Sequence, residues 1–248
     1  ESGTKIHFEG APTTQILSGN NSSGNRFWWS NRGDHINTTL TRRFDLTEVT
    51  QATLRYKIWF DIERHFDHAY VSASADDGVT WQILRGRHSE TDNRLLQSFG
   101  PSYTGKSGDG PTATWAEESI NLTPYAGGPV ILRFDYATDE GVNRDGFALD
   151  DISIKEIGFF DDGTIDLTWE ARGFVRTTNA IKQAFFVSLL LPAAESSVKQ
   201  MELDEVNKGE LLLPQNQETI VVVAALAPVT TKRTNYKVTI IEESSGGR

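Results

Sequence analysis

The segment ATLRYKIWFDI, residues 52–62, alternates apolar and polar side chains along its whole length. Its apolar face is formed by Leu54, Tyr56, Ile58, Phe60 and Ile62. Period-two alternation is typical of a half-buried β-strand. The segment 130–137, VILRFDYA, has the same pattern, and 69–84, AYVSASADDGVTWQIL, predicts two short strands around an Asp-Gly turn. No convincing amphipathic helix interrupts these patterns, so the sequence predicts an all-β fold.

Composition excludes several classes of protein. The 248 residues include 34 acidic and 24 basic side chains, a net charge of -10, which argues against a nucleic-acid partner. The absence of cysteine excludes disulfides and thiolate zinc sites. The longest apolar run, 220–229, is too short to cross a membrane, so we expect no membrane insertion. The chain opens on Glu-Ser-Gly, which favours a mature fragment or an excised piece.

A turn-rich joint, FFDDGT at 159–164, suggests a domain boundary. After it comes a series of short candidate strands, whose size and spacing indicate an immunoglobulin-like or fibronectin type III-like sandwich. We therefore expect one domain over 1–157 and a smaller β-sandwich over 158–248.

The stretch DYATDEGVNRDGFALDDISI, residues 135–154, combines many carboxylates with a strand. In a regular strand Asp150 would share a face with Ile152 and Ile154 and point towards the core, unless a bulge intervenes. A carboxylate there must be paired, densely hydrogen-bonded or bound to a metal. Oxygen ligands suit calcium, although the spacing does not fit an EF-hand.

Catalytic motifs are absent from the sequence. None of the five histidines lies in an HExxH arrangement, and neither a G-x-S-x-G elbow nor a P-loop is present. Paired carboxylates without a fixed geometry do not identify a glycosidase. We therefore expect a chain that is not an enzyme.

Several stretches carry a family resemblance: FWWSNRGDHINTTLTRRFDLT (27–47), LRYKIWFDIERHFDHAYVSASADDGVTWQIL (54–84) and INLTPYAGGPVILRFDYATDEGVNRDGFALDDISI (120–154). They resemble the module that follows the catalytic domain in immune inhibitor A-like secreted metallopeptidases. WEARGFVRTTNAIKQAFFVSLLLP (169–192) and VVVAALAPVTT (221–231) resemble the sandwich found after it in some such bacterial proteins. The resemblance implies a MAM-type jelly-roll β-sandwich followed by the smaller one. Because HExxH is absent, peptidase activity does not carry over.

The resemblance also implies a calcium ion held by a first-strand Glu and a last-strand Asp. The matching positions are Glu9 in IHFEG and Asp150 in ALDDI, with a buried ion pair or a backbone-capping carboxylate as the alternative. The further metal candidates are Asp34, which could instead cap a turn, and Asp151.

A second acidic group lies between the predicted strands. We interpret these residues as lining a solvated face, with metal binding as the alternative: Asp61, Glu63 and Asp67.

Three tryptophans form a possible ligand platform: Trp28, Trp29 and Trp59. Adjacent strand residues point to opposite faces, so one of the first two would face outward and could stack on a sugar. Core packing explains them as well, and Trp59 could instead anchor an interdomain contact.

These observations favour a non-catalytic, calcium-stabilised accessory region of a secreted or cell-surface bacterial protein. Its expected partners are the parent catalytic domain and an extracellular protein or glycan. One alternative is a carbohydrate-binding module, which would show an exposed aromatic platform. Another is a structural or adhesive surface protein.

Overall fold

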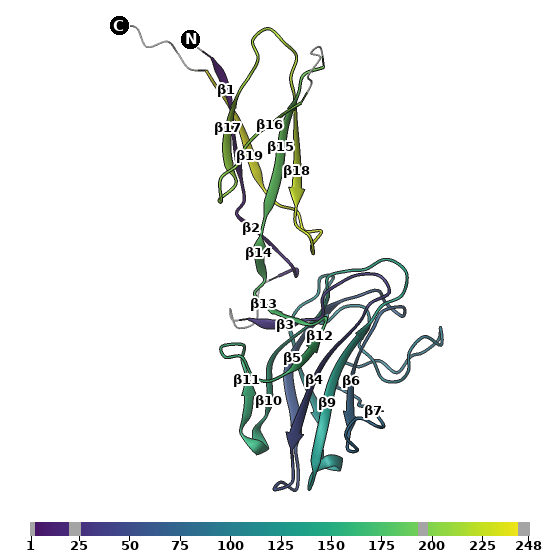
Figure 1. The fold of residues 1–248 in the computed structure, drawn as a ribbon. Coiled ribbons are helices and arrows are strands. Elements are labelled where there is room, and N and C mark those ends of the chain that lie inside the picture. The colour runs from purple at the N-terminus through teal and green to yellow at the C-terminus, as the bar shows by residue number, and fades with distance from the viewer. Residues whose placement is uncertain (1–2, 20–25, 193–197, 243–248) are drawn as a thin grey trace. The chain divides into compact units, whose positions relative to one another are not determined.

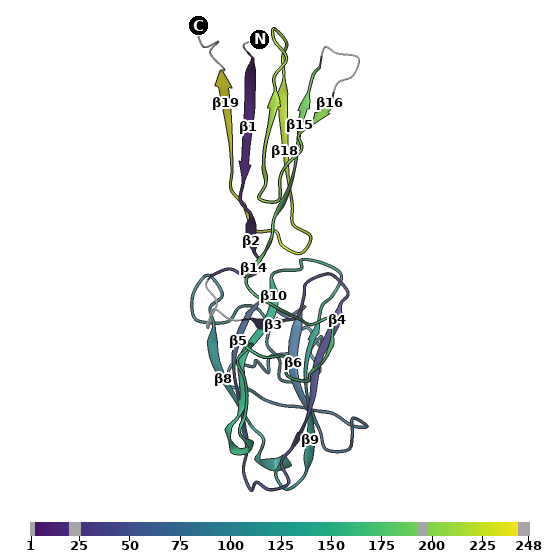
Figure 2. The same ribbon diagram turned by 60° about the vertical axis from the view of Figure 1, so that its left-hand side comes forward.

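The computed structural model describes residues 3–19, 26–192 and 198–242. It confirms the all-β fold class, since this part of the chain consists of strands β1 to β19 and two single-turn 3-10 helices, η1 (Thr123–Tyr125) and η2 (Lys155–Ile157). The chain divides into two compact units (Figures 1 and 2). Unit 1 comprises 1–16 and 180–248, and unit 2 comprises 17–179.

Unit 2 is a β-sandwich of two antiparallel sheets. The six-stranded sheet has the order β13 (Val175–Thr177), β3 (Phe27–Trp29), β10 (Gly146–Ile154), β5 (Thr53–Asp61) and β8 (Ala116–Asn121), with β11 (Phe159–Asp161) also paired to β10. The five-stranded sheet has the order β12 (Glu170–Arg172), β4 (Asn37–Asp45), β9 (Pro129–Ala137), β6 (His68–Ser74) and β7 (Gln82–Ile83).

The core of unit 2 lies between these two sheets. The inward-facing positions that the alternation of 52–62 predicts are all buried, as are their counterparts on β9, such as Leu132 and Phe134. The outer face of the five-stranded sheet instead carries polar side chains, and β9 alternates buried and half-buried residues along its length.

Unit 1 is formed by two three-stranded antiparallel sheets. The first has the order β17 (Lys208–Leu212), β1 (Thr4–Gly10) and β19 (Tyr236–Glu242), and the second the order β16 (Val198–Gln200), β15 (Ala184–Leu190) and β18 (Ile220–Leu226). A short pair, β2 (Thr13–Gln15) and β14 (Ala180–Lys182), belongs to the same unit. Its core includes Ile6, Phe8, Phe185, Val187 and Leu189.

This division differs from the expected boundaries 1–157 and 158–248. The first strand, β1, pairs with β17 and β19, so the N-terminal segment contributes to the unit that holds the C-terminal strands. Strands β11, β12 and β13 pair with β10, β4 and β3, so 159–177 completes unit 2. Both exchanges depend on long-range pairing, which local alternation does not reveal.

A β-bulge in β10 explains the carboxylates that the sequence placed in a core strand. The register with β5 shifts between Asp150 and Ser153, and Asp151 has a φ of 50°. Inserting one extra residue changes which face the following side chains occupy. Leu149 and Ile152 therefore both reach the core, whereas Asp150 lies on the other face of the sheet.

Candidate metal centre

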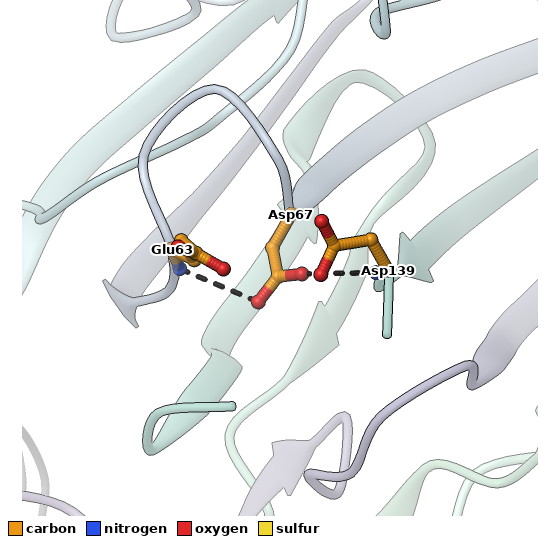
Figure 3. Close-up of side chains that lie close together, drawn as sticks. All are labelled: Glu63, Asp67 and Asp139. Atoms are coloured by element: carbon orange, nitrogen blue, oxygen red, sulfur yellow. Dashed lines mark hydrogen bonds between the residues drawn. The ribbon is translucent and has the colours of Figure 1, made fainter. Parts of the chain in front are cut away.

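Three carboxylates meet at one end of the five-stranded sheet of unit 2: Glu63, Asp67 and Asp139 (Figure 3). Asp67 immediately precedes β6, and Asp139 follows β9 by two residues. Because His68 lies opposite Ala137 in the β6–β9 ladder, the two segments leave the sheet side by side. One oxygen from each of the three residues lies within 4.8 Å of the others.

Backbone groups fix the central carboxylate. The Glu63 N–H donates to Asp67 Oδ2 at 3.3 Å, and the Asp139 N–H donates to Asp67 Oδ1 at 3.2 Å (Figure 3). The Asp67 N–H in turn donates to the Glu63 carbonyl at 3.0 Å, and Thr104 Oγ1 donates to the same carbonyl at 3.3 Å. The loop between β5 and β6 therefore presents the Asp67 carboxylate in one orientation.

Electrostatic repulsion accumulates at this cluster. Asp67 is 0% exposed, and burial raises its pKa to about 6, with the negative charges of Asp139 and Glu63 contributing further. The two backbone hydrogen bonds oppose that increase in the pKa of Asp67. Burial and the Asp139 charge also raise the pKa of Glu63, against the effect of Arg144. The cluster is thus costly to ionise unless a cation shares it.

The donor set fits a hard divalent cation. Calcium binds oxygen ligands at about 2.3–2.6 Å, so two ligands of one ion lie at most about 5 Å apart, as the oxygens of this cluster do. The neighbouring Tyr136 is fully buried, and its hydroxyl faces Asp67 without a hydrogen bond of regular geometry. A buried hydroxyl without a regular hydrogen bond calls for a further polar partner, and an ion bound by the carboxylates would provide one.

The sequence interpretation of this region was wrong for Asp67, which is buried rather than part of a solvated face. Asp61 does not belong to the cluster; its carboxylate lies 3.7 Å from Arg144 and 3.8 Å from Lys106. Asp139 is not among the candidate residues that the sequence pattern predicts. Its position, just after the strand 130–137 in an acidic segment, was the available signal.

The expected calcium pair is divided between the two units. Glu9 lies on β1 in unit 1, 3.2 Å from Lys208 Nζ and 3.6 Å from His7 Nε2, and the hydrogen bond from Lys208 lowers the pKa of Glu9. Asp150 lies on β10 in unit 2, is buried, and accepts a hydrogen bond from the Asp151 N–H at 2.9 Å. Because β1 pairs with β17 and β19, Glu9 belongs to unit 1, whereas Asp150 belongs to unit 2. The two residues therefore do not form one site within either unit.

The two further metal candidates lie outside the cluster. Asp151 is the bulge residue, and its carboxylate lies 2.6 Å from Lys57 Nζ. Asp34 is exposed and accepts a hydrogen bond from Asn143 Nδ2 at 2.8 Å.

The tryptophan platform is not present in the expected form. Trp29 and Trp59 are each 1% exposed, and their indole N–H groups donate to the carbonyls of Asp145 and Ala113. Trp28 is half-buried, with the Arg176 guanidinium 4.5 Å from its ring centroid. At Trp59 the outer face of the six-stranded sheet is covered by the loop containing Ala113, so the Trp59 ring offers no flat surface to a ligand.

Comparisons with known proteins identify a matching family and several relatives. The family model "Immune inhibitor A-like, MAM domain" matches residues 5–179, from β1 to the end of unit 2. The chain is 31% identical over 137 residues to pre-pro-metalloprotease PrtV of Vibrio cholerae serotype O1 (strain M66-2), covering 55% of this chain and 14% of that protein. It is 28% identical over 164 residues to immune inhibitor A of Bacillus thuringiensis subsp. alesti, covering 64% and 22%. Bacillopeptidase F of Bacillus subtilis (strain 168) is 22% identical over 174 residues, with coverage of 62% and 11%.

The chain therefore spans less than a quarter of the length of each of these relatives. Among the residues that the structure describes, no helix is long and apolar enough to cross a membrane.

Proposed function

The chain belongs to the immune inhibitor A-like MAM domain family, and from that membership we propose that it is the non-catalytic accessory region of a secreted bacterial metallopeptidase. The match to residues 5–179 is the observation that carries this proposal. Two of the relatives, PrtV and immune inhibitor A, span far more sequence than this chain, and PrtV is named a metalloprotease. The catalytic domain of the parent protein would be its first partner.

The residues of the chain support a non-catalytic role. A zinc peptidase needs an activated water on a metal held by histidine and carboxylate ligands. The sequence has no HExxH motif, and the acidic cluster of the described residues contains only carboxylates. Oxygen-only sites of this kind suit structural calcium rather than catalytic zinc.

Calcium is the second part of the proposal, and Glu63, Asp67 and Asp139 would hold it. The ion would supply positive charge that offsets the repulsion among the three carboxylates. Asp67 and Asp139 leave adjacent strands, while Glu63 belongs to the loop that links β5 of one sheet to β6 of the other. Neutralising the cluster would thus fasten this end of the sandwich, which suits a protein secreted into a calcium-containing medium.

The accessory role is tested in the parent metallopeptidase. Asp139→Asn should shorten the half-life of peptidase activity in calcium-containing buffer and leave the initial rate of casein hydrolysis unchanged. Glu140→Gln is the matched control, since Glu140 is exposed and adjacent to Asp139 but outside the cluster. The purified 248-residue chain alone should cleave no casein. Chelator-sensitive cleavage by the chain alone, or equal half-lives for the two variants, would contradict the proposal.

A further inference from the structure

The outer face of the five-stranded sheet in unit 2 carries a groove that plays no part in the metal centre. It consists of two adjoining hollows of about 280 and 460 Å³, which share Asn37, Trp81 and Arg133 as lining residues. Clefts of a few hundred Å³ are the usual size of small-ligand sites. We propose that this groove binds a neutral oligosaccharide chain.

Polar side chains from three neighbouring strands form the floor of the groove. In one cross-strand row, Thr39 of β4 lies opposite Asp135 of β9, which lies opposite Tyr70 of β6. In the next row, Thr41 lies opposite Arg133, which lies opposite Ser72. Hydroxyl, carboxylate and guanidinium groups within one groove are donors and acceptors that match sugar hydroxyls.

The polar floor is organised before any ligand arrives. Arg133 Nε lies 2.7 Å from Asp135 Oδ1, and Ser72 Oγ donates to Asp135 Oδ2 at 3.3 Å. The Arg133 guanidinium carbon lies 4.0 Å from the centroid of the Trp81 ring, and the Trp81 indole N–H donates to the Gly78 carbonyl at 3.0 Å. Groups held in this way lose little conformational entropy on binding, which favours affinity.

Aromatic side chains complete the groove. Trp81 is half-buried and lines both hollows, and Phe99, which is 86% exposed, lines the smaller one with its ring centroid 6.2 Å from that of Tyr70. An exposed phenylalanine beside polar groups gives the apolar face of a sugar ring a surface to stack on. Phe99 thus provides the exposed aromatic surface that Trp28, Trp29 and Trp59 do not, while Trp81 holds the Arg133 guanidinium over its ring.

The charge of the groove favours a neutral ligand. Arg133 is paired with Asp135, and the wall on β12 places Arg172 and Glu170 side by side, with the Arg172 Nε 3.0 Å from Glu170 Oε1. Both arginines that line the groove are thus paired with a carboxylate. The chain as a whole carries a net charge of -10. Polyanions are therefore disfavoured. The inference is independent of the accessory function, since it depends only on this face of unit 2.

Retention of the purified chain on an array of neutral glycans, with a soluble β-glucan, a mannan and a galactan in affinity electrophoresis, tests the proposal. We expect retention by at least one neutral glycan, weakened about tenfold by Phe99→Ala, the size of one aromatic stacking contact. Phe160→Ala is the matched control, because Phe160 is an exposed phenylalanine of unit 2 on β11, outside the groove, and it should bind like the wild type. Thr39→Phe, which fills the floor, should abolish retention, with circular dichroism confirming that the variant is folded.

Three outcomes would overturn the inference. The first is no retention by any neutral glycan, and the second is equal retention of Phe99→Ala and Phe160→Ala. The third is binding of unfolded casein in place of the glycans, weakened by the same groove variants, which would assign the groove to peptides. If Thr39→Phe does not fold, Phe99→Ala decides alone, since its exposed side chain contributes little to stability.

Discussion

Replacing Asp139 by asparagine should make the chain more stable than the wild type in chelator and less stable than the wild type in calcium. The Asp139 oxygen lies within 4.8 Å of those of Asp67 and Glu63. Two unit charges at that distance repel by about 1 kcal/mol in water and about 3 kcal/mol at the effective dielectric constant of a protein surface. Asparagine removes this charge and keeps an oxygen that can accept the Gly141 N–H, which donates to Asp139 Oδ1 at 3.1 Å. We therefore expect the metal-free variant to gain about 1–3 kcal/mol in unfolding free energy at pH 8.

Calcium should invert this difference. An ion at a thousandfold excess over its dissociation constant stabilises the wild type by about 4.1 kcal/mol, a gain that the variant lacks and that exceeds the roughly 1–3 kcal/mol of relieved repulsion. Urea unfolding of both proteins at fixed ionic strength, in chelator and in millimolar calcium, measures the two differences. Glu140→Gln should follow the wild type in both buffers. If Asp139→Asn were less stable than the wild type in chelator, the three carboxylates would not repel one another. If the variant and the wild type gained equal stability from calcium, Asp139 would not be a ligand of the ion.

The pH dependence of the metal-free wild type follows from the same cluster. The pKa of Asp67 is raised to about 6 in the folded protein, above its ordinary value of 3.8, so the folded state takes up a proton before the unfolded state does. The contribution of Asp67 is therefore unfavourable above pH 6 and is relieved as the pH falls from 6 towards 4. A carboxyl titration of Asp67 near pH 4 in chelator, followed by NMR, would be inconsistent with this burial.

Three other substitutions or titrations test the fold and the groove. Trp59→Ala should cost about 3–5 kcal/mol in the unfolding free energy of unit 2, because Trp59 is 1% exposed, and leave glycan retention unchanged; a fully stable variant would refute its burial. Phe8→Ala should cost about the same in unit 1 and raise hydrogen exchange in β15, since Phe8 packs on Phe185; unchanged exchange there would contradict the placement of β1. Hydrogen bonds from Thr80 lower the pKa of Asp76 to about 2. The ionised Asp76 should therefore stabilise the turn before Trp81 above pH 4, and this contribution should be lost as the pH falls through 2. An NMR titration midpoint of Asp76 near pH 4 would exclude these hydrogen bonds.

The sequence predicted the strands of unit 2 well, for a physical reason. Residues 53–61 and 130–137 alternate between apolar and polar side chains because one face of each strand packs in the core. That alternation can be recognised in each segment without knowledge of its partner strands. The unit boundaries were not predictable in this way. Nothing local in 4–10 shows that it pairs with 208–212 and 236–242 rather than with the strands that follow it.

The candidate metal centre was only half visible in the sequence. Glu63 and Asp67 are close in the chain, but Asp139 joins them only because β6 and β9 are paired in register. The sequence did not predict the groove, because Phe99 belongs to a loop without a periodic pattern that would place it beside the sheet. Trp59 lies on the polar side of its strand, so the sequence left a ligand platform and a covered anchor as alternatives; the structure buries Trp59 under the loop that carries Ala113.

The most direct test of the calcium proposal is isothermal titration calorimetry of the chelator-treated chain with calcium chloride. We predict binding of one ion per chain and release of protons at pH 6, where Asp67 is partly protonated. Binding should be lost in Asp139→Asn and retained in Glu140→Gln. Absence of heat from the wild type, or the same binding isotherm for Asp139→Asn, would contradict it.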